Sequence, residues 1–237
     1  MLFPVPLVRG TLIRRYKRFL SDVTLDGGET ITAHVANPGS MIGLAEPGSE
    51  VWLSPNTNPK AKLAWRWELI RVGGHLVGVN TAHPNRLIEE AVAAGAIREL
   101  AGYAVCRREV RYGVNSRIDL LLEDAGRPPC YVEIKCVNLR RGLAGRETAA
   151  EFPDAVTKRG AKHLVELGEM VAGGARAVML YVVQRGDCDH FRIAGDIDPA
   201  YAAALAVAQA RGVETLCYAC DMRLDGIGVA GAMPLKL

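Results

Sequence analysis

The stretch CYVEIKCV at residues 130–137, preceded by RIDLLLE at residues 117–123, decides the fold of the second half of this chain. Both runs are rich in aliphatic and β-branched residues, which is typical of strands. Between them lies DAGRPP at residues 124–129, whose Gly and two Pro residues indicate a turn. The sequence therefore predicts an antiparallel hairpin centred near Gly126.

Alternation along this hairpin separates an apolar face from a polar one, because neighbouring side chains of a strand point to opposite faces. The apolar face takes Ile118, Leu120, Leu122, Val132, Ile134 and Cys136. The polar face brings together Asp119, Glu133 and Lys135. With the turn centred at Gly126, Asp119 lies opposite Glu133, and their Cβ atoms are about 5 Å apart. Two carboxylates so close repel each other, so Lys135 and a divalent cation are expected to balance them.

Mg²⁺ or Mn²⁺ suits a site of a few carboxylates and waters. Such an ion would activate a water and stabilise charge on a phosphate, and Lys135 could hold that water or the developing charge. We therefore predict catalytic roles for all three residues and metal binding by Asp119 and Glu133. A salt-bridge ladder on a wet surface is the structural alternative, and such exposed pairs contribute only about 0–1 kcal/mol. The low polarity of residues 130–137 argues against an exposed edge strand.

Predicted helices on both sides of the hairpin could complete the site. The first is capped by Asn85, and its Glu89 or Glu90 would add a third carboxylate or simply face solvent. The second extends from about residue 154 to 171, and its polar residues are Asp154, Lys158, Arg159, Lys162 and His163. The spacing i, i+3, i+4 puts Arg159, Lys162 and His163 on one face. That face is predicted to bind phosphate, with a solvated basic face as the alternative.

The chain changes character near residues 80–85. Before this point short strand-like runs alternate with turns such as DGG at 26–28 and NPGS at 37–40, which favours a small β-barrel. After it, helices alternate with strands, which predicts an α/β sheet. We therefore predict two domains, residues 1–82 and residues 83–237.

The overall composition limits the kind of protein. Of 237 residues, 29 are Lys or Arg and 26 are Asp or Glu, so the net charge of +3 permits nucleic-acid binding without arguing for it. The opening MLFPVPLVRG lacks the pattern of a secretory signal. No apolar run reaches about 18 residues, so no membrane span is expected. The six Cys residues are predicted to be free thiols in the cytoplasm.

Longer strings carry a family resemblance. They are LIRRYKRFL at 12–20, NPGSM at 37–41, NRL at 85–87, SRID at 116–119, YVEIK at 131–135 and FPDAVTKRGAKHL at 152–164. In these strings the chain resembles the bacterial sugar fermentation stimulation protein A family, although the family more often has Thr than Pro at position 38. Asp119 and Glu133-Ile-Lys135 resemble the D…(D/E)xK signature of the PD-(D/E)XK nuclease superfamily.

The resemblance implies an N-terminal OB-like β-barrel followed by a C-terminal PD-(D/E)XK nuclease-like α/β domain with a mixed central sheet. It also implies DNA binding and a regulatory role in sugar (maltose) metabolism. By motif position Asp119 and Glu133 would be metal ligands, Lys135 the catalytic lysine and Glu90 the helix-borne acid. Arg117 and Asp154 are expected to support this site.

Basic and aromatic residues interleave at residues 14–19 (RRYKRF). OB-type surfaces bind single strands by stacking bases on aromatic rings beside a basic groove, at about 1–3 kcal/mol per base. The residues predicted to bind nucleic acid here are Arg14, Arg15, Tyr16, Lys17 and Arg18. Alternation along a strand lets only part of this set reach one ligand.

Two functions follow from these features. The first is a metal-dependent nuclease with DNA, or alternatively RNA, as its partner. The second is a DNA-binding regulator that does not cleave, since a fold shared with nucleases does not establish cleavage. A small-molecule enzyme is a third interpretation, supported only by Cys217-x-x-Cys220 and by GIGVAG at residues 226–231. That last string lies too near the end of the sequence to open a dinucleotide-binding unit, so we expect a flexible tail or turn there.

Overall fold

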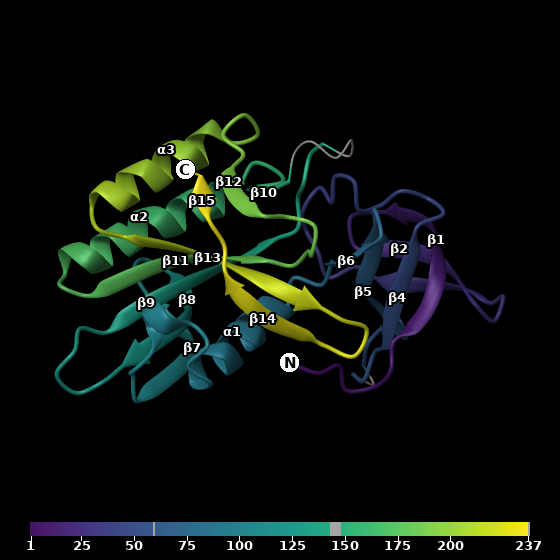
Figure 1. Cartoon of the computed structure of the whole chain (residues 1–237), viewed down its shortest axis with the longest axis horizontal. Helices are drawn as coiled ribbons and strands as arrows, with labels where there is room; N and C mark the ends of the chain where they lie inside the picture. The colour runs from purple at the N-terminus through teal and green to yellow at the C-terminus, as the bar shows by residue number, and fades with distance from the viewer. Residues whose placement is uncertain (59, 143–147, 237) are drawn as a thin grey trace.

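The N-terminal domain is a closed β-barrel (Figure 1). The computed structural model describes residues 1–58, 60–142 and 148–236. The first strands are β1 (Val8–Tyr16), β2 (Leu20–Leu25), β3 (Thr30–His34), β4 (Glu50–Pro55), β5 (Trp65–Val72) and β6 (His75–Gly78). They form one sheet in the order β3-β2-β1-β4-β5-β6, and a parallel pairing of β3 with β5 closes the first five strands into a barrel. The predicted OB-like barrel is therefore confirmed.

Alternate residues of each strand fill the barrel, because strand side chains alternate between its inside and its outside. Leu12 of β1, Val23 of β2 and Leu53 of β4 are fully buried there. Trp67 of β5 is also completely buried, and its indole Nε1 donates to the main-chain oxygen of Leu69 at 2.9 Å. A large aromatic side chain with its polar atom satisfied gives the small barrel most of its central volume.

The C-terminal domain is built around a six-stranded mixed sheet in the order β14-β13-β11-β9-β8-β7. Its elements are α1 (His83–Ala93), η1 (Arg98–Leu100), β7 (Val105–Tyr112), β8 (Ser116–Glu123), β9 (Cys130–Val137), β10 (Ala149–Phe152), α2 (Lys158–Ala172), β11 (Arg176–Val183), β12 (His190–Ile193), α3 (Pro199–Ala210), β13 (Glu214–Met222), β14 (Ile227–Ala232) and β15 (Leu235–Lys236). Strands β9, β11 and β13 are parallel to one another, whereas β7, β8 and β14 pair antiparallel with their neighbours. A small second sheet has the order β10-β12-β15.

Helices cover both faces of the central sheet. Helix α1 packs on one face and α2 on the other, with α3 alongside α2 (Figure 1). Strand β11 is accordingly buried almost throughout, as its apolar sequence AVMLYVV requires in the middle of a parallel sheet. Strand β9 lies between β8 and β11. The prediction that residues 130–137 are not an edge strand is therefore confirmed, and a wet salt-bridge ladder is excluded there.

The helices begin at other residues than the sequence suggested. Helix α1 starts at His83, and its N-cap is Ala82 without any side-chain cap. Asn85 is therefore an internal helix residue, and the prediction that it caps the helix was wrong. Helix α2 starts at Lys158 rather than near residue 154, since the hydroxyl of Thr157 accepts the N–H of Gly160 at 3.1 Å.

The C-terminal end of the sequence also differs from expectation. Residues 226–231 are not a tail, because β14 pairs antiparallel with β13 along Ile227–Ala232. Cys217 and Cys220 lie buried in β13, as the predicted strand requires, and all six cysteines are free thiols. In the described ranges, no helix has the length and apolar character needed to cross a membrane.

A loop of the barrel meets the start of α2 at the domain junction. Ser40 Oγ donates to the main-chain oxygen of Asp154 at 2.6 Å, and the N–H of Met41 donates to Asp154 Oδ2 at 3.2 Å. Gly39 lies so close to the Asp154 carboxylate that a Cβ atom at this position would collide with it. A larger residue at position 39 would thus displace the Asp154 carboxylate from its present position.

Candidate active site

Asp119 lies where its strand parts from both neighbours. The ladder between β8 and β9 ends at the pair Leu120–Val132, one position before Asp119 would face Glu133. The ladder between β7 and β8 skips the position where Asp119 would face Glu109. Instead of pairing by its main chain, Asp119 accepts the N–H of Ile134 on Oδ2 at 2.7 Å. The carboxylate of Asp119 thus forms the hydrogen bond to β9 that a main-chain oxygen would form in a regular ladder.

The same break reverses the pleat of β8. Ile118 packs in the cluster under α2, whereas Leu120 packs in the cluster under α1. The prediction that Ile118 and Leu120 share one face was therefore wrong. Its physical reason is the local loss of ladder hydrogen bonds at Asp119, which lets the strand twist between the two residues.

Glu133 is held in the interior next to Asp119. Its side chain is 4% exposed, and its Oε1 atom accepts a hydrogen bond from Lys135 Nζ at 2.7 Å. The same oxygen contacts Nδ1 of His163 from α2. The other oxygen, Oε2, is buried and has no hydrogen-bond partner among the described residues. A buried carboxylate oxygen without a partner is energetically unfavourable, so this atom is available for a ligand.

The two carboxylates differ in proton affinity. Burial, followed by the negative charge of Glu133, raises the pKa of Asp119 to about 6. Burial also acts to raise the pKa of Glu133, but the hydrogen bond from His163 and the charge of Lys135 outweigh it, and that pKa is lowered. Mutual repulsion of this kind is expected where two acids share one site. A divalent cation would relieve it.

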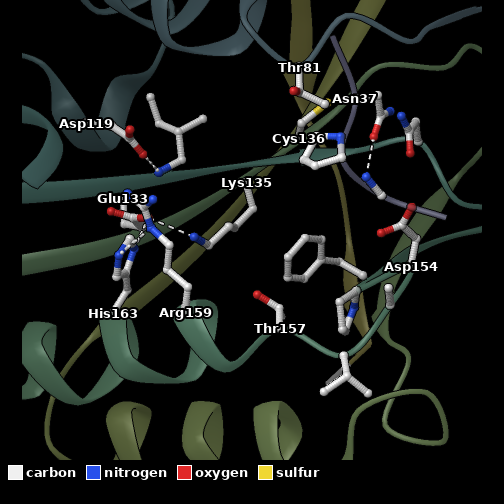
Figure 2. Close-up of a pocket in the computed structure, with 18 of the residues that line it drawn as sticks. Asn37, Thr81, Asp119, Glu133, Lys135, Cys136, Asp154, Thr157, Arg159 and His163 are labelled. Carbon is white, nitrogen blue, oxygen red and sulfur yellow. Dashed lines mark hydrogen bonds and ion pairs between the residues drawn. The ribbon is translucent and has the colours of Figure 1, made fainter. Parts of the chain in front are cut away.

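A cleft of about 630 Å³ opens onto these residues from between the two domains. Its barrel side is formed by Arg18, Asn37, Pro38 and Gly39. Figure 2 shows Lys135 reaching towards Glu133, with His163 and Arg159 next to it and Asn37 and Asp154 further along the cleft. The cleft is therefore lined by both domains and combines acids with basic and neutral polar groups.

The predicted catalytic residues Asp119, Glu133 and Lys135 are thus brought together, but Glu90 is not. Its Oε2 lies 2.9 Å from the amine of Met1, and its Oε1 accepts from Arg86 at 2.8 Å. Five residues along a helix turn the side chain by about 140°, so Glu90 points away from the side that Asn85 presents. The prediction of Glu90 as a metal ligand is corrected.

Asn85 occupies the place at α1 where an acid was expected. Its Nδ2 atom donates to Asp119 Oδ1 at 2.7 Å, and the residue lines the cleft. Sequence reasoning treated Asn85 only as a helix cap. The string NRL at residues 85–87 is one of those that carry the family resemblance. It was the feature of the sequence that could have pointed to Asn85 as a site residue.

The basic residues predicted on α2 separate. Arg159 and His163 both line the cleft, and Arg159 Nε donates to His163 Nε2 at 3.3 Å. Lys162 instead donates to the main-chain oxygen of Val114 at 2.9 Å, at the turn between β7 and β8. On a helix Lys162 lies about 100° from His163, which explains why they diverge. The prediction that all three share one face is therefore wrong. His163 contacts Glu133, and phosphate binding by Arg159 stays a prediction.

The basic segment of the barrel is also divided. Arg14 pairs with Asp22 at 2.8 Å, and the Tyr16 hydroxyl donates to the same carboxylate at 3.0 Å. Arg15 donates to main-chain oxygens of the loop that includes Asn37 and Gly39. Three of the five predicted binding residues are thus engaged within the barrel.

Lys17 and Arg18 are exposed, as Arg14 is, but within the described residues their side chains form no hydrogen bond or ion pair. Arg18 lines the cleft, whereas Lys17 does not. Arg18 is therefore the residue of this basic segment that can contact a ligand in the cleft.

The residues present fit a small oxygen-seeking cation, although the set is smaller than predicted. Across residues 1–58, 60–142 and 148–236, no group of three or more His, Cys, Asp or Glu side chains is arranged to hold a metal ion. Mg²⁺ in proteins commonly uses one or two carboxylates and keeps several waters. Asp119 and the unpartnered Oε2 of Glu133 supply that donor chemistry.

Comparisons with known proteins place both domains. The family model described as SfsA N-terminal OB domain matches residues 13–79, and the model described as Sugar fermentation stimulation protein RE domain matches residues 82–226. A sugar fermentation stimulation protein homolog of Paramagnetospirillum magneticum is 61% identical over 237 residues, covering 100% of this chain and 98% of that protein. A homolog of Rhodospirillum centenum is 63% identical over 236 residues, covering 100% of both.

Among solved structures, SfsA of Pyrococcus furiosus in complex with Ca²⁺ is similar with a TM-score of 0.89 and 26% identity, covering 100% of this chain and 98% of that chain. The fold and the family suggested by the sequence strings are thus both confirmed. The chain belongs to the sugar fermentation stimulation protein family.

Proposed function

We propose that this protein is a metal-dependent nuclease that cleaves a nucleic-acid strand bound in the cleft between its domains. The observation that carries the proposal is the buried Glu133 Oε2 without a partner beside Asp119, whose pKa is raised to about 6. Perturbed acids of this kind cluster at functional sites. A lysine on the same strand completes the set of charges that phosphodiester cleavage requires.

Asp119 and Glu133 would hold the ion, which is Mg²⁺ or Mn²⁺ in this proposal. The related Pyrococcus protein is described in complex with Ca²⁺, another cation that binds oxygen ligands. When bound, such an ion supplies Lewis-acid stabilisation of phosphate charge. In its absence the charge of Lys135 and the hydrogen bond from His163 stabilise the ionised Glu133 from the Oε1 side, which leaves its Oε2 ready to bind.

Lys135 is the group that acts on the reacting phosphate. Its Nζ lies 2.7 Å from Glu133 Oε1, and its side chain is 14% exposed at the cleft. An ammonium group has three donor positions, so Lys135 can keep its bond to Glu133 and donate to a phosphate oxygen or to the attacking water. In this role it stabilises the negative charge that develops in the transition state.

The remaining cleft residues position the strand. Arg159 and Arg18 reach the cleft from opposite domains, and guanidinium groups bind phosphate in a bidentate manner. The OB domain is consistent with nucleic-acid binding, and DNA is the proposed partner, with RNA as the alternative. Since these contacts are to the backbone, binding is expected to weaken steeply with salt.

A DNA-binding regulator of sugar metabolism genes that does not cleave is the second candidate. One observation favours it, namely that both Asp119 oxygens and Glu133 Oε1 already have protein partners. Asp119 and Glu133 would then only stabilise the structure of the cleft. Binding by such a protein would survive removal of divalent ions.

A cleavage assay separates the two functions. Labelled single- and double-stranded DNA and RNA are incubated with wild type and with Lys135→Ala, each in Mg²⁺, Mn²⁺ or EDTA. Lys236→Ala is the matched control, because that lysine is exposed on β15 and does not line the cleft. The nuclease proposal requires metal-dependent products from wild type and Lys236→Ala but not from Lys135→Ala. Salt-sensitive binding with no product on any substrate contradicts it and supports the regulator.

A further inference from the structure

Two arginines face each other across β7 and β8 just before the candidate active site. Arg111 is the direct partner of Arg117 in the antiparallel ladder, which brings their Cβ atoms to about 4.5–5.5 Å. Both side chains are exposed. In the described part of the chain neither forms a hydrogen bond or an ion pair through its side chain. Like charges in direct opposition destabilise a sheet, so the pair has no role in holding the hairpin together.

Other arginines of the same strand are paired with acids. Arg107 binds both carboxylate oxygens of Glu123 at 2.7 and 2.8 Å. Arg108 lies 3.2 Å from Glu89 of α1. Glu109, two residues from Arg111, makes no side-chain ion pair with either facing arginine within the described residues. The unpaired positive charge of these four arginines therefore lies at the Arg111–Arg117 end of the hairpin.

This end of the hairpin borders a hollow of about 450 Å³, lined by Arg111, Tyr112, Gly113, Asn115, Ser116 and Arg117. Tyr112 and Ser116 form the neighbouring ladder pair and are buried, with Tyr112 in the cluster under α2. Because strand side chains alternate, Arg111 and Arg117 extend from the opposite face. They are thus displayed to solvent rather than packed against a helix.

Arg117 precedes Asp119 by two residues on β8. Two residues of a strand span about 6.6–6.8 Å, so the main chain of Arg117 lies about that far from the main chain of Asp119, although neither arginine lines the cleft itself. An anionic group bound by the arginines would sit beside the group bound at Asp119. A polymer with regularly repeated negative charges matches that arrangement.

We propose that Arg111 and Arg117 jointly bind one backbone phosphate of the nucleic-acid strand, next to the phosphate that lies at Asp119 and Glu133. The inference rests on the proposed function, because it assumes that the cleft holds nucleic acid. The single negative charge of the phosphate lies between the two guanidinium groups and offsets part of their repulsion. The two non-bridging oxygens of a backbone phosphate have several acceptor positions, so they can accept from both guanidinium groups at once.

The test is oligonucleotide binding to the full chain in EDTA, where cleavage does not interfere, measured by fluorescence anisotropy over a range of salt concentrations. The variants are Arg111→Gln, Arg117→Gln and the double substitution, with Arg107→Gln as the matched control. Each site variant should weaken binding about tenfold or more. The slope of log affinity against log salt should fall by about 0.7–0.9 in the double variant, as for one lost phosphate contact. Because the remaining arginine still neutralises the shared phosphate, each single variant should lose less slope than the double variant.

Thermal unfolding gives a second readout. Removing one of two opposed like charges should leave the melting temperature unchanged or higher, so weaker binding cannot be ascribed to misfolding. If wild type binds the oligonucleotide and the double variant binds it with the same affinity, the arginine site is overturned and the nuclease proposal still stands. An equal loss in Arg107→Gln reveals a general charge effect and also overturns the site. Wild type that binds no oligonucleotide overturns the proposed function and the site together.

Discussion

Nδ1 of His163 contacts Oε1 of Glu133 inside the C-terminal domain, although the two residues are 30 positions apart in the chain. Arg159 Nε donates to the other ring nitrogen, Nε2, at 3.3 Å. An imidazole that accepts at Nε2 carries its proton at Nδ1. His163 therefore donates to Oε1 of Glu133, while Oε2 has no hydrogen-bond partner in the part of the chain that the structure describes.

His163→Ala should lower the free energy of unfolding by about 1–3 kcal/mol, because it removes a hydrogen bond to a buried charge. His163→Asn should recover part of this loss, since its amide nitrogen can take the place of Nδ1. The measurement is urea unfolding at pH 7.5 in EDTA. Arg159→Ala is the control on the exposed side of the same ring, and a loss below about 0.5 kcal/mol is expected for it. Equal stability of His163→Ala and wild type would contradict a structural role for this contact.

Asp119→Asn should stabilise the protein at pH 8 in EDTA. Burial, followed by the charge of Glu133, raises the pKa of Asp119 from 3.8 to about 6. A group whose pKa is raised on folding stabilises the fold fully only below its unfolded pKa, and this contribution disappears as the pH rises through about 6. A difference of about two pH units corresponds to about 3 kcal/mol at most.

The increase in the free energy of unfolding of Asp119→Asn over wild type should therefore be largest at pH 8 and vanish towards pH 4. The Asn side chain can still accept the N–H of Ile134, and the Asn85 amide can turn over to pair with it. Melting temperatures between pH 4 and 8 test this, with Asp26→Asn on the exposed barrel surface as the control. A pH-independent difference between Asp119→Asn and wild type would show that the raised pKa is not the cause.

The hairpin and its three charged residues could be predicted because they depend on local patterns. Two-residue alternation and a turn with Gly and Pro were enough to place Asp119 opposite Glu133. The reversal between Ile118 and Leu120 could not be predicted, because it arises where Asp119 takes the N–H of Ile134. That contact depends on the tertiary arrangement of three strands, and alternation in one strand carries no information about it.

Helix residues near the site were harder to assign for a related reason. Periodicity groups residues by face, but the direction in which a face points depends on packing against the sheet. Glu90 and Asn85 belong to one helix, and only the structure shows that Asn85 is directed towards Asp119. Strand β14 was missed because its glycines indicate a turn.

Divalent ions should stabilise wild type but not Asp119→Asn or Glu133→Gln. A ligand at a hundred times its dissociation constant adds about 2.7 kcal/mol by mass action. For a protein of this size that is a rise in melting temperature of about 5–10 °C. Glu90→Gln is the matched control, because the structure pairs Glu90 with Met1 and Arg86. If the ion still raises the melting temperature of Asp119→Asn, or no longer raises that of Glu90→Gln, the ion does not bind at Asp119 and Glu133.

Gly39→Ala should weaken the junction between the domains. A Cβ atom at this position would overlap the Asp154 carboxylate, which accepts from Ser40 and Met41. Losing these bonds should lower the free energy of unfolding by about 1–3 kcal/mol. Gly27→Ala is the control, because a Cβ atom there meets open space. The comparison is made by thermal unfolding, and equal melting temperatures for the two variants would contradict the close approach at Asp154.

Arg18→Gln should weaken nucleic-acid binding, whereas Arg14→Gln should not. Arg18 is exposed and lines the cleft, but Arg14 is paired with Asp22 at 2.8 Å and lies over the ring of Tyr16. An arginine that neutralises one phosphate contributes about 0.7–0.9 to the slope of log affinity against log salt. Anisotropy titrations in EDTA should therefore show a smaller slope for Arg18→Gln and the wild-type slope for Arg14→Gln. If both variants change the slope equally, the strand contacts the outer surface of β1 and not the cleft, because only that path would make the two arginines equivalent.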